Sequence, residues 1–519
     1  MKTKNFYVIL LAMICFIKSA SSQQITFQKT YGGGANEIGN SIQQTSDGGF
    51  IITGSTESYG HKNGFTDVYL IKTDSKGDTL WTKAFGGSTY DEGNAVRQTS
   101  DLGYIIAGST NSFGNGGYDV YLIRTDMNGN MLWSKTYGGT DNDYGYDVKQ
   151  TTDGGFIITG KTLNFGAINH DVYVIKTNGD GDLLWTKVFG KEGDDFAYSV
   201  QQTSDGGYII GGNRGTVGFY LVKTTSAGDS LWTKAFYIGN TSHINTIYSV
   251  QQTSDDGYVI TGNNYAMDIF LAKISSNGTI QWSKTIGGDA QDYALSVRQT
   301  TDGGYIIGGW TMSFPVGSYH SLLVRTNSIG ELVWARTYLG GGSSPIGYSV
   351  QQTADGGFIL LGSTSGVGAG LWDMYMVKMD ENGNSGSCNQ GSVTPVVTTV
   401  TTLSKFSTAV SSGGTVTTPA TKVGKGGIVT TLCSTVGFSE RIDNNSLIVY
   451  PNPFTDELLI KGTQQEGILI LFDRNGKEIL RTITFNNETR INTESLISGI
   501  YLLNYISERK SLSIKVMKY

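Results

Sequence analysis

Proline, cysteine and charged residues are all scarce in this sequence. Of 519 residues, 6 are Pro and 3 are Cys, and Asp, Glu, Lys and Arg together make up 16%. The shortage of Pro and charge excludes a disordered chain, and 72 Gly with 29 Tyr indicate a folded, turn-rich β protein rather than a helical one. The predicted class is therefore all-β.

Two further absences exclude whole groups of partners. The net charge is -6 and Lys and Arg form no cluster, so the electrostatic footprint of a nucleic-acid binder is missing. Beyond the N-terminus, no segment has about 18 consecutive apolar residues, the length that a membrane-spanning helix needs. We expect no nucleic-acid partner and no transmembrane segment in the mature chain.

The N-terminus has the pattern of a secretory signal peptide. Lys2 and Lys4 precede an apolar run at residues 6–17 that is too short to span a bilayer, and small residues follow at 19–22. We predict that residues 1–22 are removed and that the mature chain is exported. An uncleaved membrane anchor is the alternative.

Removal of the signal peptide leaves two cysteines, Cys388 and Cys433, on either side of a low-complexity stretch. Because exported proteins meet an oxidising compartment, we predict that one disulfide joins them; two unpaired thiols are the alternative. Two cysteines are too few for a metal site.

One repeat recurs seven times between residues 24 and 378. The motif Trp-Thr-Lys-Ala-Phe-Gly-Gly returns every 47 to 54 residues, in step with a second motif, Gln-Thr-x-Asp-Gly-Gly. The aromatic positions of the first motif are Phe27, Trp81, Trp133, Trp185, Trp232, Trp282 and Trp334, and the acids of the second are Asp47, Asp101, Asp153, Asp205, Asp255, Asp302 and Asp355. Each copy contains four β-prone runs bounded by turn residues, which is typical of propeller blades. We therefore predict a seven-bladed β-propeller at residues 23–380.

The two ends of the repeat array are complementary. The first copy has only the Trp-type strand, at residues 25–31, and the last copy lacks it. We expect residues 25–31 to complete the last blade as its outer strand, which closes the ring and removes an exposed sheet edge. The recurring Trp is interpreted as a wedge between neighbouring sheets, with stacking on carbohydrate as the alternative.

With the Trp strand outermost, both tight turns of each blade fall on one face, and the longer, variable loops fall on the other. Because binding groups are expected on loops held by a rigid scaffold, we predict the ligand site on this variable-loop face. The candidate residues are Tyr90, Asp91, Glu92, Asp141, Asp143, Tyr144, Asp194, Asp195, Asp289, Asp292 and Tyr293. Their carboxylates are suited to Ca²⁺ as a cofactor, or to sugars or a basic partner. Alternatively, these residues cap turns and keep the rim soluble.

A second set of variable loops carries one aromatic residue before a flexible or kinked tip, at Tyr59, Phe113, Phe165 and Phe314. Packing of these rings is the favoured interpretation, and stacking on sugars is the alternative.

The pattern Asp74-x-x-Gly77-x-x-x-Trp81 resembles both the Asp-box of sialidases and the tryptophan-docking motif of quinoproteins, but its spacing differs from each by one residue. In both families the motif builds the fold, so the resemblance implies no enzymatic activity.

Evidence for catalysis is sparse. The four histidines form no spaced metal set, and no nucleophile elbow, phosphate-binding loop or Cys–His pair is present. We predict no catalytic residues. A pair of loop carboxylates in a glycosidase arrangement is the remaining enzymatic alternative.

The composition changes after the repeats. Residues 381–446 are rich in Ser, Thr, Val and Gly and have too few large apolar side chains for a core of their own, so we expect a linker, in part β. Short alternating strands return at 447–519 and predict a small β-sandwich.

This last segment resembles a known family. The Tyr450-Pro-Asn-Pro opening, the Asp473-Arg-Asn-Gly-Lys hairpin and the Leu496-Ile-Ser-Gly-Ile-Tyr block look like the C-terminal sorting domain of type IX secretion substrates in Bacteroidetes. The resemblance implies that the secretion machinery is a partner and that the protein reaches the cell surface or the medium. The repeats resemble those of secreted propeller proteins of the SBBP type, a family with no single activity.

Together, these observations predict an exported propeller that binds an extracellular polysaccharide or protein. A secreted carbohydrate-active hydrolase that uses loop carboxylates is one alternative. A structural or adhesion component of the cell surface is the other.

Overall fold

The computed structural model describes residues 24–519 with gaps, and it separates them into two compact units divided between Val436 and Gly437. The gaps fall at 62–63, 167–168, 191–192, 216–217, 239–244, 265, 315, 341–342, 387–389, 401–403, 406–408, 412–414, 418–421, 425–427, 435–447, 451–455, 462–466, 474–476, 485–487, 498, 508–510 and 519. The predicted signal peptide and Cys388 lie outside the described residues. In the described part of the chain, no helix is long and apolar enough to cross a membrane.

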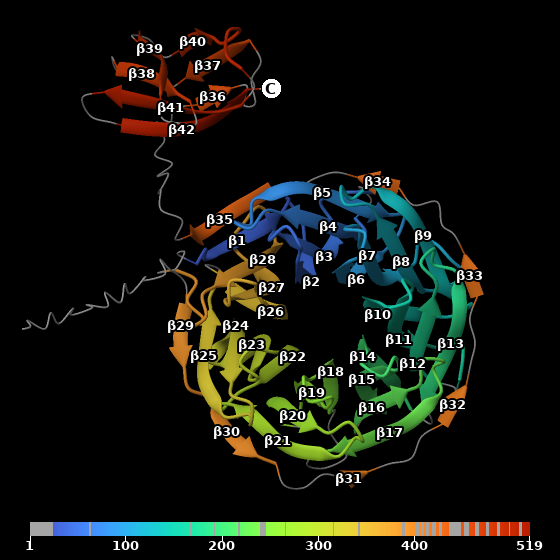
Figure 1. The fold of residues 1–519 in the computed structure, drawn as a ribbon. Coiled ribbons are helices and arrows are strands. Elements are labelled where there is room, and N and C mark those ends of the chain that lie inside the picture. Colours follow the sequence, from blue (N-terminus) through green and yellow to red (C-terminus); the bar gives the residue numbers. More distant parts are fainter. Residues whose placement is uncertain are drawn as a thin grey trace, which may run out of the picture. The chain divides into compact units, whose positions relative to one another are not determined.

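The first unit is a seven-bladed β-propeller, as predicted (Figure 1). Blade 1 contains β2 (Glu37–Gln44), β3 (Phe50–Thr56), β4 (Asp67–Thr73) and β5 (Thr79–Gly86). Blade 2 contains β6 (Asp91–Gln98), β7 (Tyr104–Thr110), β8 (Asp119–Thr125) and β9 (Met131–Gly138). Blade 3 contains β10 (Asp143–Gln150), β11 (Phe156–Thr162), β12 (Asp171–Thr177) and β13 (Leu183–Gly190). Blade 4 contains β14 (Asp195–Gln202), β15 (Tyr208–Arg214), β16 (Gly218–Thr224) and β17 (Ser230–Tyr237). Blade 5 contains β18 (Thr246–Gln252), β19 (Tyr258–Asn263), β20 (Ile269–Ile274) and β21 (Ile280–Gly287). Blade 6 contains β22 (Asp292–Gln299), β23 (Tyr305–Ser313), β24 (Val316–Thr326) and β25 (Leu332–Tyr338).

Blade 7 is built from both ends of the repeat array. It contains β26 (Ser343–Gln352), β27 (Phe358–Ser365), β28 (Trp372–Met379) and, from the N-terminal side, β1 (Phe27–Gly32). β1 pairs antiparallel with β28, with Phe27 opposite Lys378. This pairing joins the two ends of the ring, and the phenol of Tyr31 ties it to blade 1 by donating to the carbonyl of Gly77 at 2.7 Å.

An ion pair anchors the tight turn of every blade. In blade 1, the buried Lys72 ammonium lies 2.9 Å from the Asp47 carboxylate, which also accepts a hydrogen bond from the hydroxyl of Thr45. The equivalent pairs are Arg124–Asp101, Lys176–Asp153, Lys223–Asp205, Lys273–Asp255, Arg325–Asp302 and Lys378–Asp355. The acid of the Gln-Thr-x-Asp-Gly-Gly motif is therefore structural, because it connects the turn after the first strand to the end of the third strand.

The repeated Trp packs between neighbouring blades, which confirms the wedge interpretation. The Trp81 ring of blade 1 meets Tyr104 of blade 2 edge-on, with centroids 5.8 Å apart. Gly129 of blade 2 has a positive φ of 73°, and a Cβ there would lie 2.6 Å from Trp81 Cζ3. Because any side chain at Gly129 would collide with the indole, the Trp of one blade requires the turn glycine of the next.

The stretch expected to be a linker also extends the propeller. Its seven short strands, named here the outer belt, each pair antiparallel with the outermost strand of one blade. They are β29 (Gln390–Val393) on β25, β30 (Val396–Thr399) on β21, β31 (Ser404–Lys405) on β17, β32 (Ala409–Ser411) on β13, β33 (Thr415–Thr417) on β9, β34 (Lys422–Gly424) on β5 and β35 (Ile428–Ser434) on β1. The belt therefore runs once around the ring in the reverse order of the blades (Figure 1).

The second unit is a small β-sandwich. One sheet contains β36 (Ile448–Tyr450), β37 (Glu457–Lys461) and β40 (Glu488–Asn492), and the other contains β38 (Gly467–Phe472), β39 (Glu478–Thr484), β41 (Gly499–Ser507) and β42 (Ser511–Lys518). Leu458 and Ile460 of the first sheet pack with Leu469, Leu503 and Val516 of the second to form its core.

Candidate functional site

Four of the predicted site residues are buried beneath the variable loops. Asp91, Asp143, Asp195 and Asp292 each begin the innermost strand of a blade and are fully buried. The Asp91 carboxylate accepts hydrogen bonds from the backbone amide of Gly87 and the hydroxyl of Ser112, both at 2.7 Å. Burial raises the pKa of Asp143 to about 7. These carboxylates support the loops from inside, which favours the turn-capping interpretation for them.

The other predicted residues lie at the surface of the variable-loop face. Tyr90, Glu92, Asp141, Asp194 and Asp289 are exposed, and Tyr144 and Tyr293 are partly exposed. Among the described residues, no three or more His, Cys, Asp or Glu side chains converge in a way that could hold a metal ion.

One of these surface residues, Tyr144, belongs to an aromatic cluster that crosses blades 2, 3 and 4. The ring of Tyr118 stacks on that of Tyr144 with centroids 5.1 Å apart. The Lys161 ammonium lies 4.6 Å from the Tyr144 ring centroid and 4.4 Å from that of Phe196, so it is sandwiched between the two rings. His170 packs edge-on against Phe196 at 5.5 Å.

Polar groups border this cluster at both ends. The Nδ1 atom of His170 lies 3.0 Å from the Asp194 carboxylate. Burial raises the pKa of Tyr144, and the carboxylate of Glu92 raises it further. The cluster therefore combines ring faces with carboxylates and an imidazole, groups that can stack on sugar rings and hydrogen-bond to hydroxyls.

A second group of aromatic rings lies in blade 6. Tyr293 and Trp310 stack almost parallel, with centroids 4.2 Å apart and an interplanar angle of 11°. Tyr319 packs against the same indole at 5.1 Å.

The aromatic loop tips pack against their own blades. Tyr59 stacks on Tyr69 at 5.5 Å, and Phe113 lies 5.8 Å from Tyr121. Phe165 makes the same contact with Tyr173. The packing interpretation is thus confirmed for these three tips.

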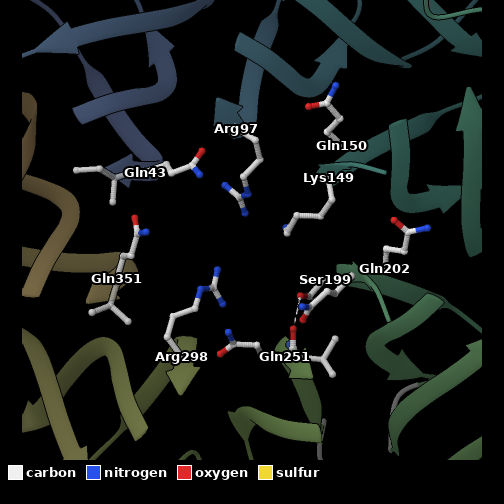
Figure 2. A pocket seen from close by; sticks show the side chains of 13 residues that line it. Gln43, Arg97, Lys149, Gln150, Ser199, Gln202, Gln251, Arg298 and Gln351 are labelled. Atoms are coloured by element: carbon white, nitrogen blue, oxygen red, sulfur yellow. Dashed lines mark hydrogen bonds between the residues drawn. The ribbon is translucent and has the colours of Figure 1, made fainter. Parts of the chain in front are cut away.

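A cavity of about 380 Å³ lies on the axis of the ring, at the tight-turn end (Figure 2). It is lined by the last residues of the innermost strands, which run from the variable loops toward the Asp-Gly-Gly turns. Arg97 follows Asp91 by six positions on β6, which is about 20 Å of extended strand. The cavity and the aromatic cluster are therefore at opposite ends of the innermost strands.

One side chain from each blade forms a ring around this cavity. The seven equivalent residues are Gln43, Arg97, Lys149, Gln201, Gln251, Arg298 and Gln351. Arg97, Lys149 and Arg298 point toward the axis from three different blades (Figure 2). Sequence reasoning missed this group because it sought function only in the loops. The available signal was a repeat position occupied by Gln in four copies and by a cation in three.

Residues 448–519 match the secretion system C-terminal sorting domain. This part of the chain therefore carries a sorting domain of the type IX secretion system, as predicted, and the protein is secreted through that system to the surface or the medium.

Similarity to individual known proteins is more limited. The chain is 27% identical over 178 residues to the regulatory protein FlaEY of Caulobacter vibrioides, an alignment covering 29% of this chain and 18% of FlaEY. Among solved structures, the chain is similar to PorZ, a surface component of the type IX secretion system of Porphyromonas gingivalis. The TM-score is 0.38 and the identity is 11%, and the match covers 94% of this chain and 59% of PorZ. It is also similar to Sqt1 from Chaetomium thermophilum, with a TM-score of 0.40 and 12% identity over 65% of this chain and 82% of Sqt1.

Proposed function

We propose that this secreted propeller binds an extracellular polysaccharide through the aromatic cluster on its variable-loop face. The observation that carries the proposal is the row formed by Tyr118, Tyr144, Lys161, Phe196 and His170, which draws side chains from three consecutive blades. All five side chains are partly exposed. A partly exposed row of rings suits a polymer, because successive sugars can stack on successive rings.

The surrounding polar groups support a sugar ligand. Glu92 and Asp194 are exposed carboxylates that can accept hydrogen bonds from sugar hydroxyls. The rings are held by packing between blades, so the surface is formed before the ligand arrives and little conformational freedom is lost on binding.

A glycan array probed with residues 23–519, with and without Ca²⁺, tests the proposal. We expect binding to a restricted set of polysaccharides, and we expect Tyr144→Ala to weaken it by about tenfold or more because a central ring is lost. The Ca²⁺ arm tests whether the acidic loops need a cation.

Trp310→Ala in blade 6 is the matched control, since it removes an aromatic side chain on the same face but outside the cluster. Loss of binding in Trp310→Ala with full binding in Tyr144→Ala would place the site in blade 6 and contradict the proposal. Hydrolysis of a panel polysaccharide would instead support the hydrolase alternative, and binding restricted to proteins would also overturn the proposal.

A further inference from the structure

The ring around the axial cavity is rich in hydrogen-bond donors. The side-chain oxygen of each ring glutamine already accepts a hydrogen bond from a backbone amide of the next blade. These bonds are Gln98 N to Gln43 Oε1 at 2.7 Å, Gln252 N to Gln201 Oε1 at 2.8 Å, Gln299 N to Gln251 Oε1 at 2.7 Å and Gln44 N to Gln351 Oε1 at 2.9 Å. Because the oxygen of each glutamine is held by this bond, the NH₂ group supplies a donor to the cavity.

The remaining ring positions add positive charge. Arg97 lies 3.1 Å and Lys149 2.6 Å from the same carboxylate, that of Asp147. Arg298 donates to the hydroxyl of Ser249 at 3.3 Å and to the carbonyl of Val297 at 2.7 Å, and it has no ion pair within the described part of the chain. Three cationic side chains thus line a partly enclosed cavity, and the one carboxylate beside them pairs with only two of the three, so positive charge is in excess there.

We propose that this cavity binds the oxyanion group of a small ligand, such as a carboxylate, sulfate or phosphate, that enters from the tight-turn face. Charged donors and amide N–H groups that line one cavity match the oxygens of such a group. The volume of about 380 Å³ admits a ligand of about monosaccharide size but not a folded partner. This site is independent of the polysaccharide surface at the other end of the innermost strands.

The electrostatics of the free cavity agree with this assignment. Burial, followed by the neighbouring charge of Arg97, lowers the pKa of Lys149 to about 7. Burial and Arg97 also lower the pKa of Arg298 to about 10. Both shifts express a cost of placing cations close together out of water, and a bound oxyanion would offset that cost.

Isothermal titration calorimetry on residues 23–519 at pH 6 and low ionic strength tests the proposal with three probes: inorganic sulfate, glucuronate and uncharged glucose. We expect saturable binding of sulfate or glucuronate and none of glucose. Tighter binding of glucuronate would identify an acidic sugar as the source of the oxyanion, whereas binding of sulfate alone would identify a free tetrahedral anion.

The decisive variant is Lys149→Gln/Arg298→Gln, because four of the seven ring positions already carry Gln and the fold accommodates it there. We expect this variant to keep its melting temperature within a few degrees and to lose at least about tenfold in affinity for the oxyanion. Lys187→Gln is the control, since it removes a cation from an exposed ion pair on an outer strand. Unchanged oxyanion binding in the double variant, or no binding of either anion by the unmodified chain, would overturn the proposal. Neither result would affect polysaccharide binding by the aromatic cluster.

Discussion

Lys149 donates hydrogen bonds of 2.6 Å to both carboxylate oxygens of Asp147, two residues earlier on β10. The equivalent position to Asp147 is Ser in five of the other blades and Ala in blade 2. The blade that brings an ammonium to the axis therefore also brings the carboxylate that partly neutralises it. The pair makes the charge of the cavity sensitive to pH near neutrality.

Oxyanion affinity is expected to fall about tenfold between pH 6 and pH 8. Lys149, with a pKa of about 7, loses its proton in this window, while Arg298, with a pKa of about 10, keeps its charge and Asp147, whose pKa is lowered, stays ionised. Titration calorimetry at several pH values measures the effect. Lys149→Arg should bind equally well across the window, because arginine keeps its charge. A flat profile for the unmodified chain would show that Lys149 takes no part.

Removing a turn carboxylate is expected to destabilise the propeller at neutral pH only. Asp205 has a pKa of about 2, because Lys223 and Thr203 donate to it. Its contribution is therefore complete above the unfolded value of 3.8 and is lost as the pH falls through about 2. Since the Asp205 side chain is more than half exposed, solvent screening limits the loss in Asp205→Asn to roughly 1–2 kcal/mol.

Urea unfolding of Asp205→Asn at pH 7 and at pH 2 checks this, with Asp229→Asn as the control. Asp229 lies in an exposed turn before β17 and pairs with Lys187 of blade 3 at 3.0 Å, so its loss should change the unfolding free energy by less than about 0.5 kcal/mol. An equal effect of the two substitutions at pH 7 would contradict a special role for the turn pair.

Trp185, one of the repeated tryptophans between blades, should contribute far more to the stability of the propeller than the adjacent Leu184. Trp185 contacts Tyr208 of the next blade edge-on at 5.9 Å, whereas the adjacent Leu184 is 56% exposed. Trp185→Ala is expected to cost about 2–4 kcal/mol through lost contacts between blades, and Leu184→Ala less than about 0.5 kcal/mol. Chemical unfolding monitored by circular dichroism measures both. Similar losses for the two variants would argue against docking between blades.

Deleting the outer belt, residues 390–434, is expected to lower the melting temperature and promote association. Without the belt, seven outermost strands expose unpaired backbone groups that can pair with other chains. Differential scanning fluorimetry and light scattering measure the two effects. Deleting residues 437–519 instead should leave both unchanged, because that segment forms a separate compact unit.

The deletion of residues 437–519 has a separate expected effect on export. It removes the sorting domain at 448–519, so the protein should be retained inside the outer membrane. Fractionation of the producing bacterium, followed by immunoblotting of surface and medium, measures this. Unchanged surface delivery would show that the sorting domain is dispensable.

Much of the fold could be predicted because each blade repeats the same short sequence motifs. Turn glycines, period-two strands and the placement of Trp81 and its counterparts locate the strands, and the offset ends of the array indicate that residues 25–31 add to the last blade. The outer belt was harder to foresee. Its strands of two to seven residues carry no hydrophobic pattern of their own, since their partners are strands of the propeller far away in the sequence.

The candidate sites, like the fold, could be predicted only in part from the sequence. Tyr144 and Asp194 could be selected from the sequence because they follow a glycine-rich turn in a variable loop. That Asp91 and Asp143 are buried could not, because adjacent residues of a strand point to opposite faces and only the packing of the next blade shows which face is covered.

The sequence by itself determined the all-β class, the seven blades and the secretion route, since these depend on short motifs and their spacing. Only the tertiary structure decided that Arg97, Lys149 and Arg298 surround one cavity and that a low-complexity segment encircles the ring. The physical reason is closure: residues about one or more repeats apart become neighbours only when seven twisted sheets meet around a common axis. No local sequence pattern indicates which residues this closure brings together.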